Sequence, residues 1–174
     1  MKLLGLDPGL RTTGWGLIDV EANRLRHLAN GAVATRRGDG LAERLLEIYE
    51  ALLKVIDEYA PDAAAVEETF VARNLGSALR LGQARGVVLL APASRGLPVA
   101  EYAPNLIKKT VVGTGHAGKA QIRMMVGHLL PGCSIEGEDA ADALAVAICH
   151  AHHLQTNRIW SAALERAGAK EVTA

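Results

Sequence analysis

The segment from Glu138 to His153, EDAADALAVAICHAHH, constrains the fold of this chain more than any other. Ala, Leu, Val and Ile fill positions 140–148 without a Gly or Pro, so the segment is expected to be helical. Almost every position through Cys149 is apolar, and a helix that is apolar nearly all round is usually buried. We therefore expect this helix to lie in the interior of the domain.

Two carboxylates open this apolar helix. Helical geometry places Asp139 and Asp142 one turn apart on one face, where like charges in poor solvent are costly unless they are compensated. The segment alone leaves two explanations open. The acids are favoured by the free N–H groups and the dipole of the first helical turn, or they hold a divalent cation together with acids from elsewhere in the chain.

The order of the remaining elements predicts a mixed α/β domain. Apolar runs bounded by turn residues predict strands at 2–7, 14–20, 24–35, 62–68 and 97–102. Helices are expected at 40–60, 75–94, 104–111 and 119–130. The first strand is apolar on both faces, so it is expected in the middle of the sheet. We expect one domain over residues 1–156 and a polar C-terminal tail over 157–174.

Composition limits the class of protein. The 174 residues suffice for one compact domain. The two cysteines, Cys133 and Cys149, have no metal-like spacing and fit a reducing compartment. The N-terminus does not resemble a signal peptide, and no apolar run approaches the roughly 20 residues of a membrane span. These features predict a cytoplasmic protein without membrane contact.

Charge is unevenly distributed although the formal net charge is zero. From Asp39 to Glu68 there are nine acids against two bases, and from Arg73 to Arg123 there are eight bases against one acid. The basic half is either a surface that faces a polyanion or a set of ordinary solvated helix faces.

Further acids stand at the ends of predicted strands. Asp7 closes the first strand and Glu67 closes the fourth, and if these strands are neighbours, both side chains emerge at the same end of the sheet. Together with Asp139 and Asp142, they form the set of oxygen donors that Mg²⁺ prefers. By itself, Asp7 also fits a turn residue, since Asp7-Pro8-Gly9 is favourable turn chemistry.

Four motifs together resemble one known family. LGLDPGLRTTGWG, VEETFVARNLGSALRLGQARGV, TVVGTGHAGKAQI and EDAADALAVAICH come in the order and spacing of the RuvC-type Holliday-junction resolvases. The resemblance extends over roughly residues 1–153. It implies a ribonuclease H-like fold, with a mixed five-stranded sheet flanked by helices. It also implies a homodimeric, magnesium-dependent endonuclease that makes paired symmetric nicks in four-way DNA junctions during homologous recombination and DNA repair.

The resemblance also implies roles for particular residues. The catalytic, metal-binding acids would be Asp7, Glu67, Asp139 and Asp142. They would hold two Mg²⁺ ions, with Mn²⁺ as a substitute, and the nicks would leave 5′-phosphate and 3′-hydroxyl ends. The expected DNA contacts are Phe70, Arg73, Lys108, Lys109, His116 and Lys119. Expected partners are four-way junction DNA, a second copy of the chain and a branch-migration complex of the RuvA and RuvB type.

Several of these residues keep a second interpretation. Phe70 is either a core side chain or an aromatic offered to an unstacked base, and Lys119 is either a phosphate contact or an exposed lysine at a helix start. His116 is either a proton shuttle or a DNA contact.

Three other functions fit parts of the sequence. LGLDPGLRTTGWG also looks like the phosphate loop of a sugar kinase or actin-like ATPase, but 174 residues leave no space for the second domain of such proteins. A nuclease of ribosomal RNA precursors shares the expected fold. A non-catalytic junction-binding module would not require a complete set of four acids.

Overall fold

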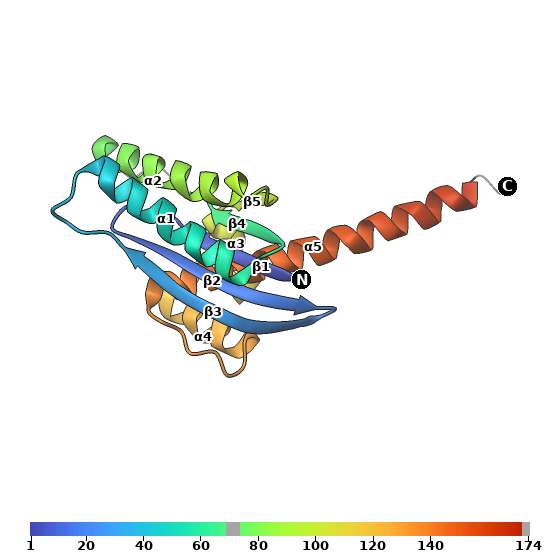
Figure 1. Ribbon diagram of the computed structural model, residues 1–174. Helices are drawn as coiled ribbons and strands as arrows, with labels where there is room; N and C mark the ends of the chain where they lie inside the picture. Colours follow the sequence, from blue (N-terminus) through green and yellow to red (C-terminus); the bar gives the residue numbers. More distant parts are fainter. Residues whose placement is uncertain (69–73, 172–174) are drawn as a thin grey trace.

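A five-stranded mixed sheet forms the centre of the molecule, and its strand order is β3-β2-β1-β4-β5 (Figure 1). The computed structural model describes residues 1–68 and 74–171, with side chains described to residue 157. The strands are β1 (Lys2–Asp7), β2 (Thr12–Glu21), β3 (Arg24–Ala34), β4 (Ala63–Glu67) and β5 (Val99–Tyr102). β1 pairs antiparallel with β2 and parallel with β4, so the predicted central place of the first strand is confirmed.

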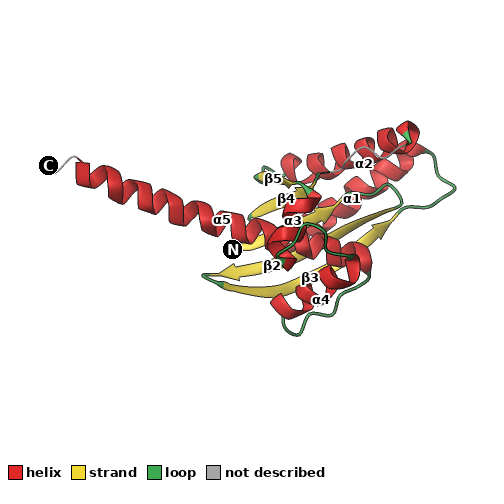
Figure 2. Cartoon of the chain, turned by 180° about the vertical axis from the view of Figure 1, so that it is seen from behind, coloured by secondary structure: helices red, strands yellow, loops and turns green. Residues whose placement is uncertain are grey.

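Helices cover both faces of the sheet (Figures 1 and 2). They are α1 (Leu41–Tyr59), α2 (Leu75–Ser94), α3 (Pro104–Val112), α4 (Lys119–Leu129) and α5 (Glu138–Glu171). One buried cluster joins the sheet to α1 and α2 through side chains such as Leu52 and Val88. A second buried cluster joins the opposite face to α3, α4 and α5 through side chains such as Ile107, Val126 and Ile148.

The alternation of side chains along the strands decides on which face the strand-end acids lie. In β1, Leu4 and Leu6 belong to the core under α1 and α2, whereas Leu3 belongs to the core under α5. Asp7 has the parity of Leu3 and therefore lies on the α5 face. In β4 the same alternation places Glu67 on that face, and the pairing of Leu6 with Val66 brings the ends of the two strands side by side.

Glycines let α5 approach the sheet closely. A Cβ on Gly5 would overlap the carbonyl oxygen of Ala143, and a Cβ on Gly14 would overlap that of Asp139. The helix is buried from Ala140 through Ala151 except at Asp142, which is half-buried, as its apolar sequence predicts. The start of α5 is therefore fixed against β1 and β2, beside Asp7.

α5 is longer than the sequence pattern suggests. Its backbone stays helical through Glu171 and extends well beyond the body of the domain (Figure 1). The division into a domain over 1–156 and a tail over 157–174 stays a prediction. Within the described residues, no helix combines the length and apolar character needed to cross a membrane.

Candidate active site

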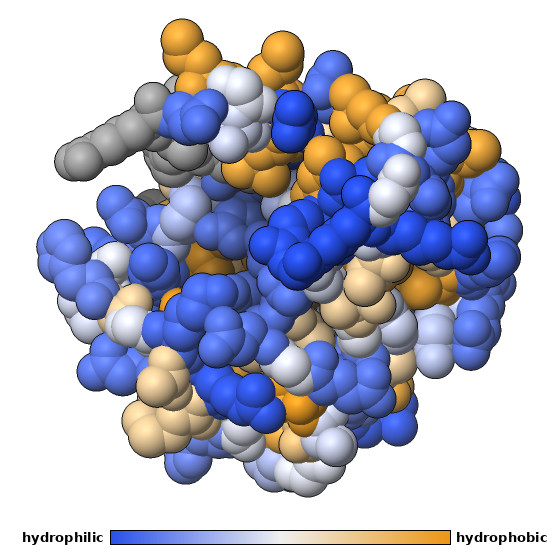
Figure 3. Space-filling view, turned by 90° about the vertical axis from the view of Figure 1, so that its left-hand side faces the viewer, coloured by the Kyte–Doolittle hydropathy of each residue, from blue (hydrophilic) through white to orange (hydrophobic). Residues whose placement is uncertain are grey.

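Four carboxylates meet at the carboxyl ends of the two central parallel strands. Asp7 ends β1, Glu67 ends β4, and Asp139 and Asp142 lie in the first turns of α5. Figure 3 looks onto this end of the molecule, where hydrophilic residues predominate and the surface is hollowed. Three separate elements thus contribute to one site, as the sequence predicts.

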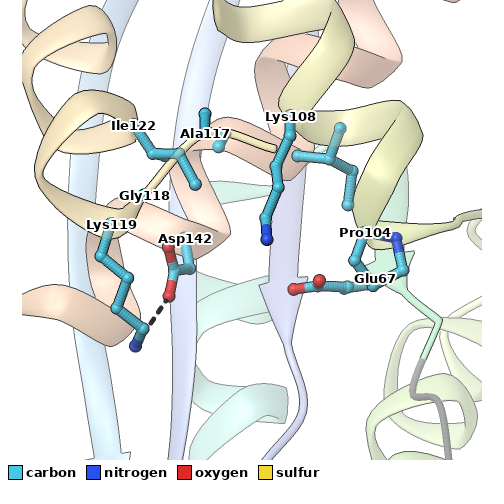
Figure 4. A pocket seen from close by; sticks show the side chains of 10 residues that line it. Glu67, Pro104, Lys108, Ala117, Gly118, Lys119, Ile122 and Asp142 are labelled. Carbon is cyan, nitrogen blue, oxygen red and sulfur yellow. Dashed lines mark ion pairs between the residues drawn. The ribbon is translucent and has the colours of Figure 1, made fainter. Parts of the chain in front are cut away.

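The acids lie between two adjoining hollows. A cleft of about 310 Å³ is lined by Glu67 and Asp142 and by the cations Lys108 and Lys119 (Figure 4). A neighbouring groove of about 570 Å³ is lined by Asp139. The site is therefore open on two sides, and an extended ligand has room to cross it.

Among the four acids, Asp7 has the pKa that departs most from its ordinary value. Burial is the main cause, and the negative charges of Glu67 and Asp142 add to it, so that the pKa of Asp7 rises from 3.8 to about 8. Protonated Asp7 donates a hydrogen bond to the carboxylate of Glu67. At neutral pH and without a cation, the two acids therefore share a proton instead of carrying two charges.

The other acids are partly compensated by lysines. Burial raises the pKa of Glu67, and Lys108 and Lys119 lower it by a smaller amount. Burial also raises the pKa of Asp142, against the opposing effect of Lys119. The Lys119 Nζ lies 3.4 Å from the Asp142 Oδ2 and 3.3 Å from the Glu138 Oε2, and the charge of Asp142 raises the pKa of Lys119.

The donor set fits hard divalent cations. All four groups are carboxylates, and their mutual repulsion and burial leave a demand for positive charge that Lys119 meets only in part. Among the described residues, no three Asp, Glu, His or Cys side chains are already arranged as a metal-binding group. In this arrangement, the shared proton of Asp7 and Glu67 and the ammonium of Lys119 compensate the charge.

A mixed sheet with this strand order, and an acidic cleft with lysines at its rim, define the class as ribonuclease H-like nucleases. Such a site suits the cleavage of a phosphodiester, because lysines can attract an anionic backbone and carboxylates can hold the divalent cations that assist cleavage.

Comparison with known proteins identifies the family. Residues 3–150 match the family described as "Crossover junction endodeoxyribonuclease RuvC", and the chain belongs to this family of endodeoxyribonucleases. Proteins of this name from Paramagnetospirillum magneticum and Paracoccus denitrificans are 58% and 61% identical to it. The first alignment covers 95% of this chain and 100% of the relative, and the second covers 89% and 94%.

A solved structure shares the fold. The structure described as T. thermophilus RuvC in complex with Holliday junction substrate superposes with a TM-score of 0.83 at 34% identity. The match covers 90% of this chain and 96% of that chain. The predicted ribonuclease H-like fold is therefore confirmed.

Only some of the predicted DNA-contact residues line the cleft. Lys108 reaches from α3 toward Glu67, and Lys119 stands at the start of α4 opposite Asp142 (Figure 4). Lys109 and His116 are exposed but do not line the cleft. Phe70 and Arg73 lie outside the described residues.

The sequence patterns did not identify two arginines that lie near the acids. Arg11 and Arg44 line the groove beside Asp139, together with Arg80. Arg11 follows Asp7 by four positions in the first motif, which was the available signal. Arg44 lies in the amphipathic helix α1, where a charged residue looks like part of a solvated face.

Proposed function

We propose that this chain resolves Holliday junctions by paired, symmetric, magnesium-dependent nicks, and that Asp7, Glu67, Asp139 and Asp142 hold the cations. The convergence of four carboxylates with insufficient compensating charge supports this proposal most directly. The complex of the T. thermophilus relative with a Holliday junction supports the choice of substrate.

Divalent cations, once bound, supply an activated water and stabilise the leaving oxygen. The residues of the chain prepare the site for them. Carboxylates bind cations in their ionised form, so Asp7, whose raised pKa keeps it protonated near neutral pH, would have to release its proton to hold a cation together with Glu67. Lys119 then exchanges part of its contact with Asp142 for the anionic phosphate, where it stabilises developing charge. The products carry 5′-phosphate and 3′-hydroxyl ends.

Lys108 binds the DNA backbone next to the cleaved phosphate in this proposal. Its ammonium lies on the Glu67 side of the cleft, while Lys119 lies on the Asp142 side, so the two cations flank the acids. Contacts with phosphates position DNA without reading its sequence, which suits a substrate recognised by its shape. Phe70, Arg73, Lys109 and His116 remain predicted contacts.

The active unit is a homodimer formed through α2. Leu75, Leu79 and Leu90 are 80%, 66% and 56% exposed, respectively. They are spaced along one side of the helix with the exposed Gly82 and Gly86 between them. A second copy would cover this apolar stripe, and a two-fold dimer matches a nearly two-fold junction. Analytical ultracentrifugation should give twice the monomer mass, and Leu79→Glu should shift it to the monomer mass. A monomer with full activity would contradict the dimer.

The function is tested with a synthetic four-way junction, labelled on opposing strands. The protein should nick both strands with Mg²⁺ or Mn²⁺, and the nicks should be closed by DNA ligase, which requires a 5′-phosphate and a 3′-hydroxyl. Asp142→Asn should bind the junction without nicking it. The control Glu68→Gln removes the neighbouring acid of Glu67, which alternation places on the other face of the sheet, so it should nick normally.

Two results would reject the proposal: nicking that persists in EDTA, or nicking by Asp142→Asn at the wild-type rate. Cleavage of structured RNA in preference to the junction would favour the RNA nuclease instead. In recombination and repair, the expected partner is a branch-migration complex of the RuvA and RuvB type.

A further inference from the structure

The groove beside Asp139 has a charge pattern that the acid cleft does not explain. Besides Asp139, its charged lining residues are Arg11, Arg44 and Arg80. In the described part of the chain, no ion pair neutralises any of these guanidinium groups. By contrast, Arg85 is paired with Glu101. Three unneutralised arginines around one acid make the groove suited to a polyanion.

Hydrogen bonds from two threonines hold the loop that carries Arg11. The Thr13 Oγ1 donates to the Gly9 carbonyl at 2.7 Å, and the Thr35 Oγ1 donates to the Leu10 carbonyl at 2.7 Å. The Thr35 backbone N–H donates to the Arg11 carbonyl at 3.1 Å. Three successive carbonyls of residues 9–11 are therefore fixed, directly after Asp7.

Arg44 connects this loop to α1. Its Nε donates to the Thr35 Oγ1 at 2.9 Å, and its Nη2 donates to the Leu10 carbonyl at 2.9 Å. A planar guanidinium can make both bonds at once, while a lysine ammonium lacks this fork. Both acceptors are neutral, so Arg44 holds the loop and keeps its own positive charge beside the groove.

We propose that Arg11, with Arg80, binds the backbone of the cleaved DNA strand on the Asp139 side of the acids, and that Arg44 is the positioning residue that holds the Arg11 loop. The groove adjoins the acid cleft, because Asp139 lines one and Asp142, one turn later on α5, lines the other. A strand that passes over the acids is then held by lysines on one side and by arginines on the other. This inference rests on the proposed function, so the experiment must distinguish a failure of the groove assignment from a failure of the proposed function.

The test measures junction affinity over a salt series with Ca²⁺ in place of Mg²⁺, and single-turnover nicking with Mg²⁺. Arg11 is exposed, and its side chain makes no hydrogen bond to any residue that the structure describes, so Arg11→Gln should fold normally. The log–log slope of affinity against salt should become shallower by about 0.9, the contribution of one phosphate. Arg24→Gln is the matched control, since Arg24 is an exposed arginine at the opposite end of the sheet, and its slope should not change.

The role of Arg44 is tested by a double-mutant cycle. Arg44→Lys keeps the charge but cannot make both bonds, so it should reproduce the shallower slope of Arg11→Gln. The double variant should be no worse than Arg11→Gln alone, because Arg44 acts through Arg11. Thr35→Val replaces Arg44→Lys in the cycle if the latter does not fold.

Each outcome has a separate meaning. An unchanged slope for Arg11→Gln would overturn the groove assignment, and fully additive effects of the two substitutions would overturn the positioning role. Wild-type protein that fails to nick the junction would overturn the proposed function. Normal nicking by the wild type with a shallower slope for Arg11→Gln supports both.

Discussion

Replacing Asp7 by Asn should stabilise the metal-free protein while it abolishes nicking. The pKa of Asp7 is about 8 in the folded protein, against an ordinary value of 3.8. The folded state therefore binds more protons than the unfolded state between these two pH values, and the free energy of unfolding falls as pH rises through this window. The loss begins near pH 4 and is complete near pH 8.

The magnitude follows from the same shift. Each pKa unit corresponds to about 1.4 kcal/mol, so at pH 7 an isolated group with this shift would reduce stability by roughly 4 kcal/mol. Asp7 shares its proton with Glu67, and the burial cost of Glu67 remains in the variant. We therefore expect Asp7→Asn to gain about 1 to 3 kcal/mol at pH 7, which raises the melting temperature by about 2–4 °C per kcal/mol in a domain of this size.

Thermal melts in EDTA at pH 3.5, 5.5 and 7.5 measure the effect. The difference between wild type and Asp7→Asn should be small at pH 3.5 and largest at pH 7.5. Mg²⁺ should raise the melting temperature of the wild type more than that of the variant, since binding to the folded state alone stabilises it. This account of the site would be refuted if the variant were less stable than the wild type at pH 7.5 in EDTA. It would also be refuted if the two melting temperatures differed by the same amount at every pH. Retained nicking by the variant would remove Asp7 from the catalytic set.

Three further predictions follow from packing, burial and charge. Gly14→Ala should cost about 1–3 kcal/mol, because the new methyl group pushes the start of α5 away. A displacement of about 1 Å should slow single-turnover nicking about 100-fold, whereas Gly127→Ala, with open space, should not. Burial lowers the pKa of His150, so the free energy of unfolding should fall as pH drops below 6.5. In His150→Gln, the free energy of unfolding should depend less on pH in this range. Lys108→Ala should make the salt slope of junction binding shallower by about 0.9, and Lys109→Ala should change it less; equal changes would contradict the placement of Lys108.

The fold and the convergence of the four acids at one end of the sheet could be predicted because their signals are local and periodic. Alternation along β1 and β4 determines the face of Asp7 and Glu67, and the apolar run of α5 identifies a buried helix. The family resemblance pointed to the same acids independently. The assignment of these acids to cations stays a prediction, and it rests on the charge balance of the site.

The remainder of the site depends on contacts that leave no periodic trace. The bonds from Arg44 to Thr35 and Leu10 join three parts of the chain, and each residue looks ordinary in its own segment. The sequence pattern also gives no reason to expect different surroundings for Asp139 and Asp142. In the structure they line different hollows, Asp139 the groove and Asp142 the cleft.

The position of α5 couples the stability of the domain to the geometry of its site. The helix that carries Asp139 and Asp142 is the same one that is buried against the sheet, α3 and α4 over the following residues. Its small residues and the glycines beneath it leave little space for movement, so these two acids are attached to a closely packed part of the molecule. Asp7 and Glu67, at the ends of adjacent central strands, are fixed in the same way. The basic residues around the acids lie instead on the surrounding helices and on the loop after Asp7, which is held by hydrogen bonds such as those of Arg44. A site built in this manner keeps the acid geometry constant, while the surrounding basic residues can be adjusted to the DNA without disturbing the core.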